Sequence, residues 1–233
     1  MCTIVIFSII YCITLIIFVA SYYKTQEALH WWSYRQSIKL FLEAEAIRDS
    51  LLQESFIIRR SLELLPSDDL ELSAHQTQEC LKKVDNLHQS LTRLSERLFP
   101  EYFQGSLPLA IQGVLQTWAI SHPDICFNIS LPMRWQHEPI ERSLIVAWSL
   151  EELLRITVPE VLTPTSIYIH LQERKNRAKF IVQMTYPDVS VSTSILYYSQ
   201  LEFKFLSKSF RILTSGQCFY LHKSLNITWY FCW

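Results

Sequence analysis

One helical stretch holds the residue whose chemistry matters most for this chain. Residues 43–64 read EAEAIRDSLLQESFIIRRSLEL, and Arg48 stands directly before Asp49. A guanidinium stays protonated, so Arg48 can form ion pairs but cannot act as a nucleophile at neutral pH. The simplest interpretation of Arg48 is a solvated residue beside an apolar stripe. His88 lies in a second helical stretch, where a hydrogen-bonded histidine of a helix bundle is the simpler interpretation.

The remaining reactive side chains form no catalytic pattern in the sequence. Glu151 and Glu152 are adjacent carboxylates, which a solvated helix face explains. Asp188 stands at the end of an expected strand, before a serine-rich stretch that reads as a loop. Cys126 and His122 lie near each other across a proline, without the strand–turn–helix of a nucleophile elbow. The six cysteines have no CxxC pair and no histidine at metal-binding spacing, so they predict free thiols in a reducing compartment and no metal site.

The glycine content and the net charge exclude two common classes of function. The chain has only three glycines, Gly105, Gly113 and Gly216, and no two are close in sequence. A P-loop or a GxGxxG turn is therefore impossible, because such loops need glycine for backbone N–H groups to approach phosphate. The formal net charge of −1 lacks the basic surplus of nucleic-acid-binding proteins. We therefore expect no nucleic acid among the partners.

The first twenty residues predict a membrane anchor. Residues 2–20 contain no charged side chain and, at about 1.5 Å per helical residue, approach the thickness of a bilayer core. Tyr22, Tyr23, Trp31 and Trp32 follow, and such rings favour the membrane interface. A secretory signal peptide is the alternative, but the basic n-region and the small-residue cleavage site are missing. Basic residues after the span place the remainder in the cytoplasm by the positive-inside bias.

Two amphipathic stretches follow the anchor and predict a helical hairpin, because apolar residues recur in both at spacings of three and four or their sums. In the first stretch they are Leu40, Ala44, Ile47, Leu51, Ile58, Leu62 and Leu65; in the second they are Leu81, Val84, His88, Leu91 and Leu98, widened by Leu87 and Leu94. Pro66 and Pro100 end the two stretches. Because a lone hairpin cannot bury both stripes, we expect a homodimeric four-helix bundle, with packing against the C-terminal half as the alternative.

The C-terminal half predicts a mixed α/β domain. Helices are expected over 106–121, 138–156 and 194–213, and the first has a serine cap and an early proline. Strands are expected over 124–132, 166–174 and 178–187, and a final pair within 216–233 is joined near 223–226. The order of elements is therefore α, β, α, β, β, α, β, β.

Residues 46–53 resemble the dimerisation helix of bacterial sensor histidine kinases of the NarX/DesK type. The family's pattern is E-L-H-D-G-L-x-Q-x-L, in which the histidine accepts the phosphoryl group. Ala46-Ile47-Arg48-Asp49-Ser50-Leu51-Leu52-Gln53 matches that pattern at Asp49, Leu51 and Gln53, and Arg48 stands where the histidine would stand. The resemblance implies that phosphotransfer from this position is lost.

The order of elements after residue 40 also resembles these kinases, in which a GHKL (histidine kinase-type ATPase) domain follows the hairpin. Residues 106–132 look like the family's first helix and strand, and residues 213–233 look like its closing hairpin. The resemblance implies an α+β protein of three parts. They are a transmembrane anchor over 1–23, a juxtamembrane helix and dimerisation hairpin over 24–100, and a degenerate ATPase-like α/β sandwich over 101–233.

The match fails at the residues that bind ATP in the family. The family's E-x-x-x-N motif, in which asparagine binds Mg²⁺, falls on a helix with Glu151 and Glu152 but no asparagine, and Arg155 offers no oxygen ligand. Asp188 stands where the family's D-x-G-x-G aspartate accepts from the adenine amine, with serines in place of the glycines. No glycine follows before residue 201, so a lid over the triphosphate has nowhere to form. Glu151 and Asp188 are the residual candidates, and we expect no bound cofactor.

The sequence thus predicts a membrane-anchored, histidine-kinase-like signalling protein that lacks catalytic activity and acts by protein–protein interaction in a two-component pathway. The expected partners are a second copy of the chain, an active histidine kinase or a response regulator. We expect a single-pass protein of the bacterial inner membrane, with its C-terminal bulk in the cytoplasm. One alternative is a divergent active kinase that uses ATP and Mg²⁺, with Asp188 at the adenine and His88 as phosphoacceptor. The other is a structural membrane coiled-coil protein.

Overall fold

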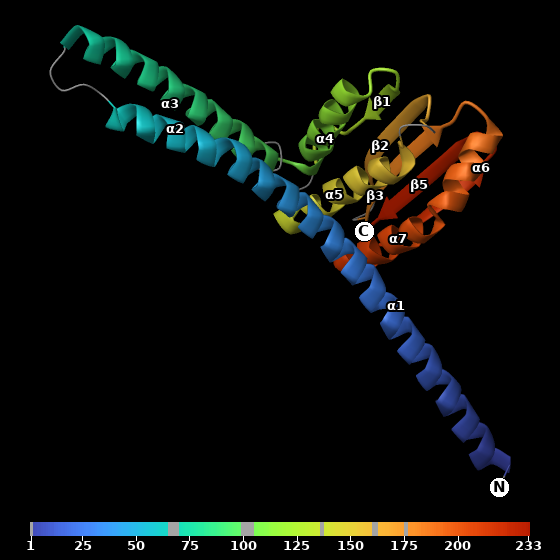
Figure 1. The fold of residues 1–233 in the computed structure, drawn as a ribbon. Helices are drawn as coiled ribbons and strands as arrows, with labels where there is room; N and C mark the ends of the chain where they lie inside the picture. Colours follow the sequence, from blue (N-terminus) through green and yellow to red (C-terminus); the bar gives the residue numbers. More distant parts are fainter. Residues whose placement is uncertain (1, 65–69, 99–104, 136–137, 160–162, 175–176) are drawn as a thin grey trace. The chain divides into compact units, whose positions relative to one another are not determined.

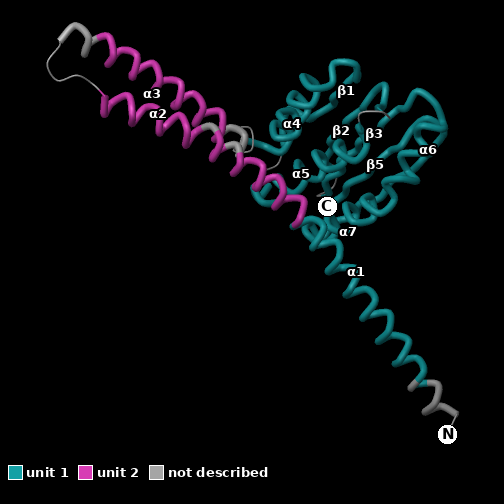
Figure 2. The backbone as a smooth tube through the Cα atoms, viewed as in Figure 1, with its two compact units in different colours: residues 1–33, 102–233 teal, residues 34–101 magenta. Residues whose placement is uncertain are grey.

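The chain forms two compact units, residues 1–33 with 102–233 and residues 34–101 (Figure 2). The structure is a computed structural model and describes every residue except 1, 65–69, 99–104, 136–137, 160–162 and 175–176. The first unit contains an apolar helical segment and an α/β domain, and the second contains a helical hairpin.

Helix α1, Cys2–Ala46, begins in the apolar N-terminal segment. Among the helices of the described residues, one is long and apolar enough to cross a membrane, and it is the one that begins here. The large apolar side chains from Phe7 to Val19 are 41–72% exposed, so the described protein does not enclose them. Length and composition therefore meet the requirements of a membrane span.

The second unit is a helical hairpin. A π-helical turn, Ile47–Leu51, leads from α1 into α2, Leu52–Glu63, and α3, Leu70–Leu98, returns along it. The side chains that pack between them are Leu51 and Ile58 on one helix and Cys80, Leu87 and Leu94 on the other. Within each helix these residues recur every seven positions, as in a coiled-coil seam.

This packed seam is narrower than the stripes that the sequence predicts. Leu40, Leu62, Leu81, Val84 and Leu91 are 42–62% exposed, and Leu65 lies outside the described residues. Two helices touch along a single line, so each covers only one row of the other's side chains. The stripes are thus partly exposed in the single chain, as expected for a hairpin that cannot bury both of them alone. The dimer that would cover the exposed row stays a prediction.

The α/β domain of the first unit is built on one five-stranded sheet, in the order β1-β2-β3-β5-β4. The strands are β1 Cys126–Ser130, β2 Ser166–Arg174, β3 Arg177–Thr185, β4 Gln217–Lys223 and β5 Asn226–Cys232. β1 pairs parallel with β2, and the other neighbours pair antiparallel. The sheet is mixed because β1 and β2 are joined through a helix, whereas β2–β3 and β4–β5 are hairpins.

Helices cover one face of this sheet (Figure 1). They are α4 Leu107–Ser121, α5 Ile140–Thr157, α6 Val189–Tyr198 and α7 Gln200–Thr214. Alternate residues of the strands point into this layer, and Phe180, Val182 and Trp229 are completely buried there. The Tyr186 hydroxyl donates to the carbonyl oxygen of Thr157 at 3.1 Å, which ties the end of β3 to the end of α5.

The predicted helices and strands are present in the expected order, with two corrections between residues 188 and 213. A single helix over 194–213 is wrong, because Ser199 adopts φ −98° and ψ 9° and separates α6 from α7. The serine-rich stretch after Asp188 is also helical rather than a loop, since α6 begins at Val189. A short helix, α6, therefore lies between β3 and α7 in the sequence.

Candidate functional site

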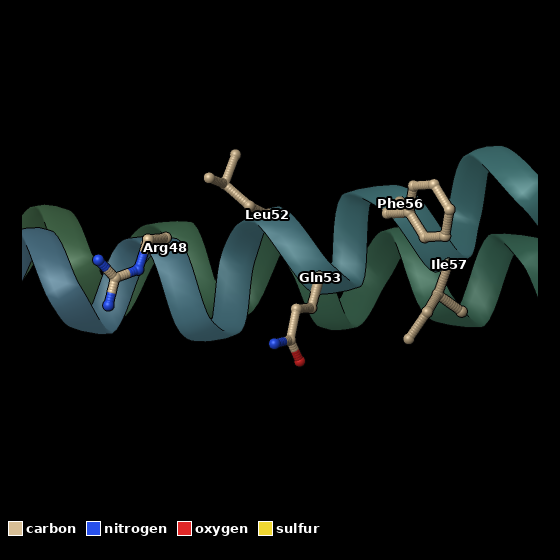
Figure 3. Close-up of a pocket in the computed structure, with 5 residues that line it drawn as sticks. All are labelled: Arg48, Leu52, Gln53, Phe56 and Ile57. Carbon is tan, nitrogen blue, oxygen red and sulfur yellow. The ribbon is translucent and has the colours of Figure 1, made fainter.

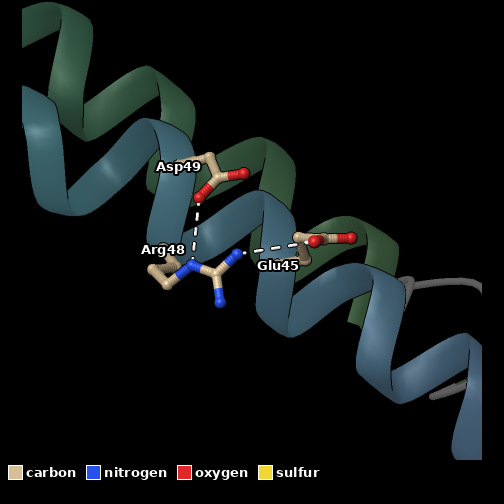
Figure 4. A network of polar contacts seen from close by, with 3 residues as sticks. All are labelled: Glu45, Arg48 and Asp49. Carbon is tan, nitrogen blue, oxygen red and sulfur yellow. Dashed lines mark hydrogen bonds and ion pairs between the residues drawn. The ribbon is translucent and has the colours of Figure 1, made fainter.

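Arg48 is held by two carboxylates near it on the same helix (Figure 4). Its Nε donates to Asp49 Oδ1 at 3.0 Å, and its Nη2 lies 3.4 Å from Glu45 Oε1. The hydrogen bond and charge of Asp49 raise the pKa of Arg48. All three side chains are at least 44% exposed, so water screens these pairs. Arg48 can donate to an acidic partner, but it cannot accept a phosphoryl group.

An open hollow of about 490 Å³ lies on the helix beside Arg48 (Figure 3). Its lining is Arg48, Leu52, Gln53, Phe56 and Ile57, all from consecutive turns of one helical segment. Leu52, Phe56 and Ile57 are 60%, 63% and 51% exposed. A surface formed by one helix is not an enclosed small-molecule cavity. Exposed apolar side chains next to a charged one instead suit contact with another helix.

His88 lies on α3 and is exposed, outside the seam formed by Cys80, Leu87 and Leu94. The expectation of a histidine packed inside a dimeric bundle stays a prediction. The helix places His88 one position after Leu87, which turns its side chain away from the line of contact with α2. Both Arg48 and His88 belong to the unit of residues 34–101.

On α5 one cation pairs with both candidate carboxylates. Arg155 Nη1 donates to Glu152 Oε1 at 2.9 Å, and Arg155 Nη2 lies 3.7 Å from Glu151 Oε1. The Glu152 side chain is only 4% exposed, so its charge needs such a partner. Because Arg155 brings a positive charge where Mg²⁺ would need an oxygen ligand, these residues do not fit an Mg²⁺ site. Within the described residues, no group of three or more His, Cys, Asp or Glu side chains could hold a metal ion.

Asp188 forms the N-cap of α6. Its Oδ1 accepts from the backbone N–H of Val191 at 3.0 Å and from the hydroxyl of Ser190 at 2.6 Å. The hydrogen bond from Ser190, followed by that from Val191, lowers the pKa of Asp188. The serines that follow belong to the first turn of α6, so this stretch is helical and does not form a loop that could wrap around a phosphate or an adenine. The carboxylate of Asp188 therefore has a local structural role.

The thiols in the described part of the chain are free. Cys12, Cys80, Cys126, Cys218 and Cys232 form no disulfide, as the sequence predicts. Burial raises the pKa of Cys218 to about 12, and burial also raises the pKa of Cys232. Both thiols are protonated at neutral pH, so neither is a ready nucleophile.

The sequence patterns missed a contact between α1 and α7. The hydroxyl of Ser209 donates to the carbonyl oxygen of Ala28 at 2.8 Å, and the rings of Trp31 and Phe205 lie 6.0 Å apart between centroids. Trp32 is 8% exposed and belongs to the core of the α/β domain. The expectation that Trp31 and Trp32 lie at the membrane interface is therefore corrected. Ser209 and Ala28 are 181 positions apart, so no local pattern could reveal their contact.

Several solved histidine kinase structures are similar to this chain. The Acinetobacter baumannii histidine kinase AdeS has a TM-score of 0.39 and 10% identity, over 78% of this chain and 95% of that one. A histidine kinase domain from an Erythrobacter litoralis blue-light-activated kinase has a TM-score of 0.41 and 9% identity, over 76% and 94%. Histidine kinase ThkA in complex with the response regulator TrrA has a TM-score of 0.40 and 13% identity, over 91% and 65%.

No protein-family model matches the chain, and no curated protein sequence matches it. The structural resemblances all lie below a TM-score of 0.5 and at 13% identity or less. They do not establish a family for this chain.

Proposed function

We propose that this chain is a membrane-anchored, histidine-kinase-like protein without kinase activity, which acts by binding other proteins of a two-component pathway. The observation that carries the proposal is the exposed apolar surface of α2. Leu52, Phe56 and Ile57 there are each at least half exposed, directly beside Arg48. A hydrophobic surface of this kind on a helical hairpin costs solubility unless another protein covers it.

The chemistry of the candidate positions supports a binding role over a catalytic one. Arg48 replaces the nucleophile that the family's pattern would have and cannot be phosphorylated as a histidine can. Arg155 forms ion pairs with Glu151 and Glu152 at the position of the family's Mg²⁺ ligand. Asp188 caps α6 instead of standing free at a loop. At each of these positions the charged side chain forms an ion pair or a hydrogen bond within its own helix.

The proposed partners bind the hairpin. A second copy of the chain, or an active histidine kinase, would pair its own hairpin with the exposed rows of α2 and α3 and complete a four-helix bundle. A response regulator is the third proposed partner, and exposed Arg48 would contribute hydrogen-bond donors to an acidic surface on it. The anchor would hold these complexes at the cytoplasmic face of the bacterial inner membrane.

The test is self-association of the full chain in detergent micelles, measured by sedimentation velocity. Phe56→Asp places a charge in the exposed apolar surface, and we expect self-association about tenfold weaker or worse. Tyr197→Asp is the matched control, because Tyr197 is 78% exposed on α6 and lies in the other unit. Wild-type chain should also co-purify with a partner histidine kinase or change its autophosphorylation. Monomeric wild type with neither effect on any kinase of the same cell would refute the binding role.

A divergent active kinase is the second candidate, and the exposure of His88 favours it. An imidazole on the surface of α3 is accessible to a kinase domain, whereas a buried one would not be. This candidate requires that the chain bind ATP.

A further inference from the structure

The α/β domain is attached to the segment of α1 that follows the apolar span, and α7 makes the attachment. Phe205 packs against Trp31, and Ser209 donates to the carbonyl oxygen of Ala28. Ala28 is completely buried. Figure 1 shows α7 ending beside α1. All these residues belong to the same compact unit, so the contact is part of one folded body.

The two helices run in opposite directions along this contact. Moving forward along α7 from Phe205 to Ser209, the contacted residue of α1 moves back from Trp31 to Ala28. The long side chain of Lys208, which lies between these two residues on α7, reaches further back along α1, and its Nζ donates to the carbonyl oxygen of Ser21 at 3.3 Å. The C-terminal half of α7 therefore points toward the end of α1 that continues into the apolar segment.

Positive charges gather at this end of the contact. Loss of solvent lowers the pKa of Lys208, and the neighbouring charges of Lys24 and Arg211 lower it further, while Glu27 opposes them. Lys24 follows Ser21 by one turn of α1 and Arg211 follows Lys208 by one turn of α7, so the hydrogen bond from Lys208 to Ser21 brings these cations to one place, with the carboxylate of Glu27 nearby. Like charges held this close repel, so an anion placed among them would be stabilised.

The position of these charges along α1 indicates which anion they would meet. Ser21 and Lys24 lie within one to four residues of the apolar run that ends at residue 20, which is about 6 Å of helix. Tyr22 and Tyr23 between them are 55% and 63% exposed, as amphipathic rings at a bilayer interface are. Lys208 reaches along α1 toward this level, in the way that long basic side chains extend toward headgroups.

We propose that Lys24, Lys208 and Arg211 form a site for the phosphate groups of anionic phospholipids, which holds the end of α7 against the membrane surface. The proposal rests on the membrane anchoring proposed above, and it goes beyond it by assigning a lipid class and the residues that contact it. Basic residues near an anionic leaflet strengthen surface contact by about fivefold each. The α/β domain would then respond to the lipid composition of the membrane through α7.

Hydrogen–deuterium exchange of the full chain in lipid nanodiscs tests the site. Exchange of the amides of α7 should be about fivefold slower in phosphatidylcholine bilayers that contain phosphatidylglycerol than in phosphatidylcholine alone. Arg211→Gln and Lys208→Gln should each remove most of this difference. Lys223→Gln is the matched control, because Lys223 is an exposed cation at the far end of β4 from α7, and it should leave the difference intact. Salt at about 1 M should abolish it in the wild type.

The other outcomes separate the two proposals. A chain that stays in nanodiscs but exchanges equally in both bilayers overturns the lipid site and leaves the anchor standing. A chain that alkaline carbonate extracts from phosphatidylcholine bilayers overturns the anchor and the lipid site together. Inorganic phosphate added to chain in phosphatidylcholine nanodiscs should not slow exchange. If it does, the site binds a small anion and the lipid proposal is wrong, as it is if Lys223→Gln abolishes the difference.

Discussion

Arg48 and Arg155 each form ion pairs with carboxylates on their own helix. Arg48 pairs with Asp49 and Glu45, and Arg155 pairs with Glu152 and Glu151. In both cases one guanidinium pairs with two carboxylates on the same helix.

The Asp188 side chain caps the N-terminus of α6 and should stabilise the fold. Asp188→Ala removes the acceptor for the Val191 N–H, so the thermal midpoint at neutral pH should fall. Folding lowers the pKa of Asp188, so its contribution is present above the unfolded aspartate pKa of about 4 and is lost as pH falls through the folded value. The deficit of the variant should shrink in that acidic range when thermal unfolding is followed by circular dichroism. Asp124→Ala, which removes another exposed carboxylate, is the control, and an equal deficit at all pH values would contradict the assignment.

Among the elements, the turn between α7 and β4 brings the start of β4 against the end of β5. Ser215 ends α7 with φ 55°, in the left-handed region that glycine would occupy at less cost. Gly216, the next residue, is needed for a different reason. A Cβ at Gly216 would collide with the backbone carbonyl oxygen of Cys232, and it would also approach Thr214 Oγ1 at 2.8 Å. The glycine thus permits a close approach of two backbones rather than a special dihedral angle.

Two substitutions in this turn should have opposite effects. Gly216→Ala forces β4 away from the end of β5, and we expect a loss of about 1–3 kcal/mol in the free energy of unfolding. Ser215→Gly relieves the left-handed backbone and should gain up to about 1 kcal/mol. Urea unfolding of the full chain in detergent, followed by tryptophan fluorescence, measures both. A neutral Gly216→Ala would show that the two backbones are not in close contact.

The whole molecule has three parts. They are an apolar helix, a hairpin with exposed apolar rows, and a sheet domain that contacts α1 through α7. The parts that would contact other molecules are all on helices: the segment 2–20, α2 and α7. The interior of the sheet domain is filled by aromatic side chains such as Phe180, Phe203 and Trp229, which are buried. The proposed contacts with other molecules are therefore on the outer surfaces of these helices.

The response of the full chain to nucleotide distinguishes a protein that acts only by binding from an active kinase. A protein that acts only by binding should show no change in thermal midpoint with millimolar Mg·ATP, because Arg155 offers Mg²⁺ no oxygen ligand and Asp188 is a helix cap. Nucleotide at 100 times its Kd would add about 2.7 kcal/mol to the folded state, which a thermal melt detects easily. A clear upward shift, with labelled phosphate retained by wild type and lost in His88→Ala, would instead support a kinase.

The sequence alone was sufficient for the features that depend on neighbours within one element. Alternation predicted the strand over 124–132, and the serine before an early proline predicted the helix that begins at Leu107. The lack of charge over 2–20 predicted an apolar helix, and the three scattered glycines excluded phosphate loops. These properties follow from backbone geometry and side-chain periodicity, which act over a few residues.

Tertiary structure decided which of the available surfaces are packed. Both stripes of the hairpin have helical periodicity, but only the contact between α2 and α3 shows that Leu51 and Ile58 are buried while Leu62 is exposed. Trp32 is of a residue type that favours the membrane interface, yet it lies in the core of the α/β domain. Ser209 reaches Ala28 across 181 positions of sequence. Such contacts depend on where distant segments meet, and local propensity does not encode that meeting.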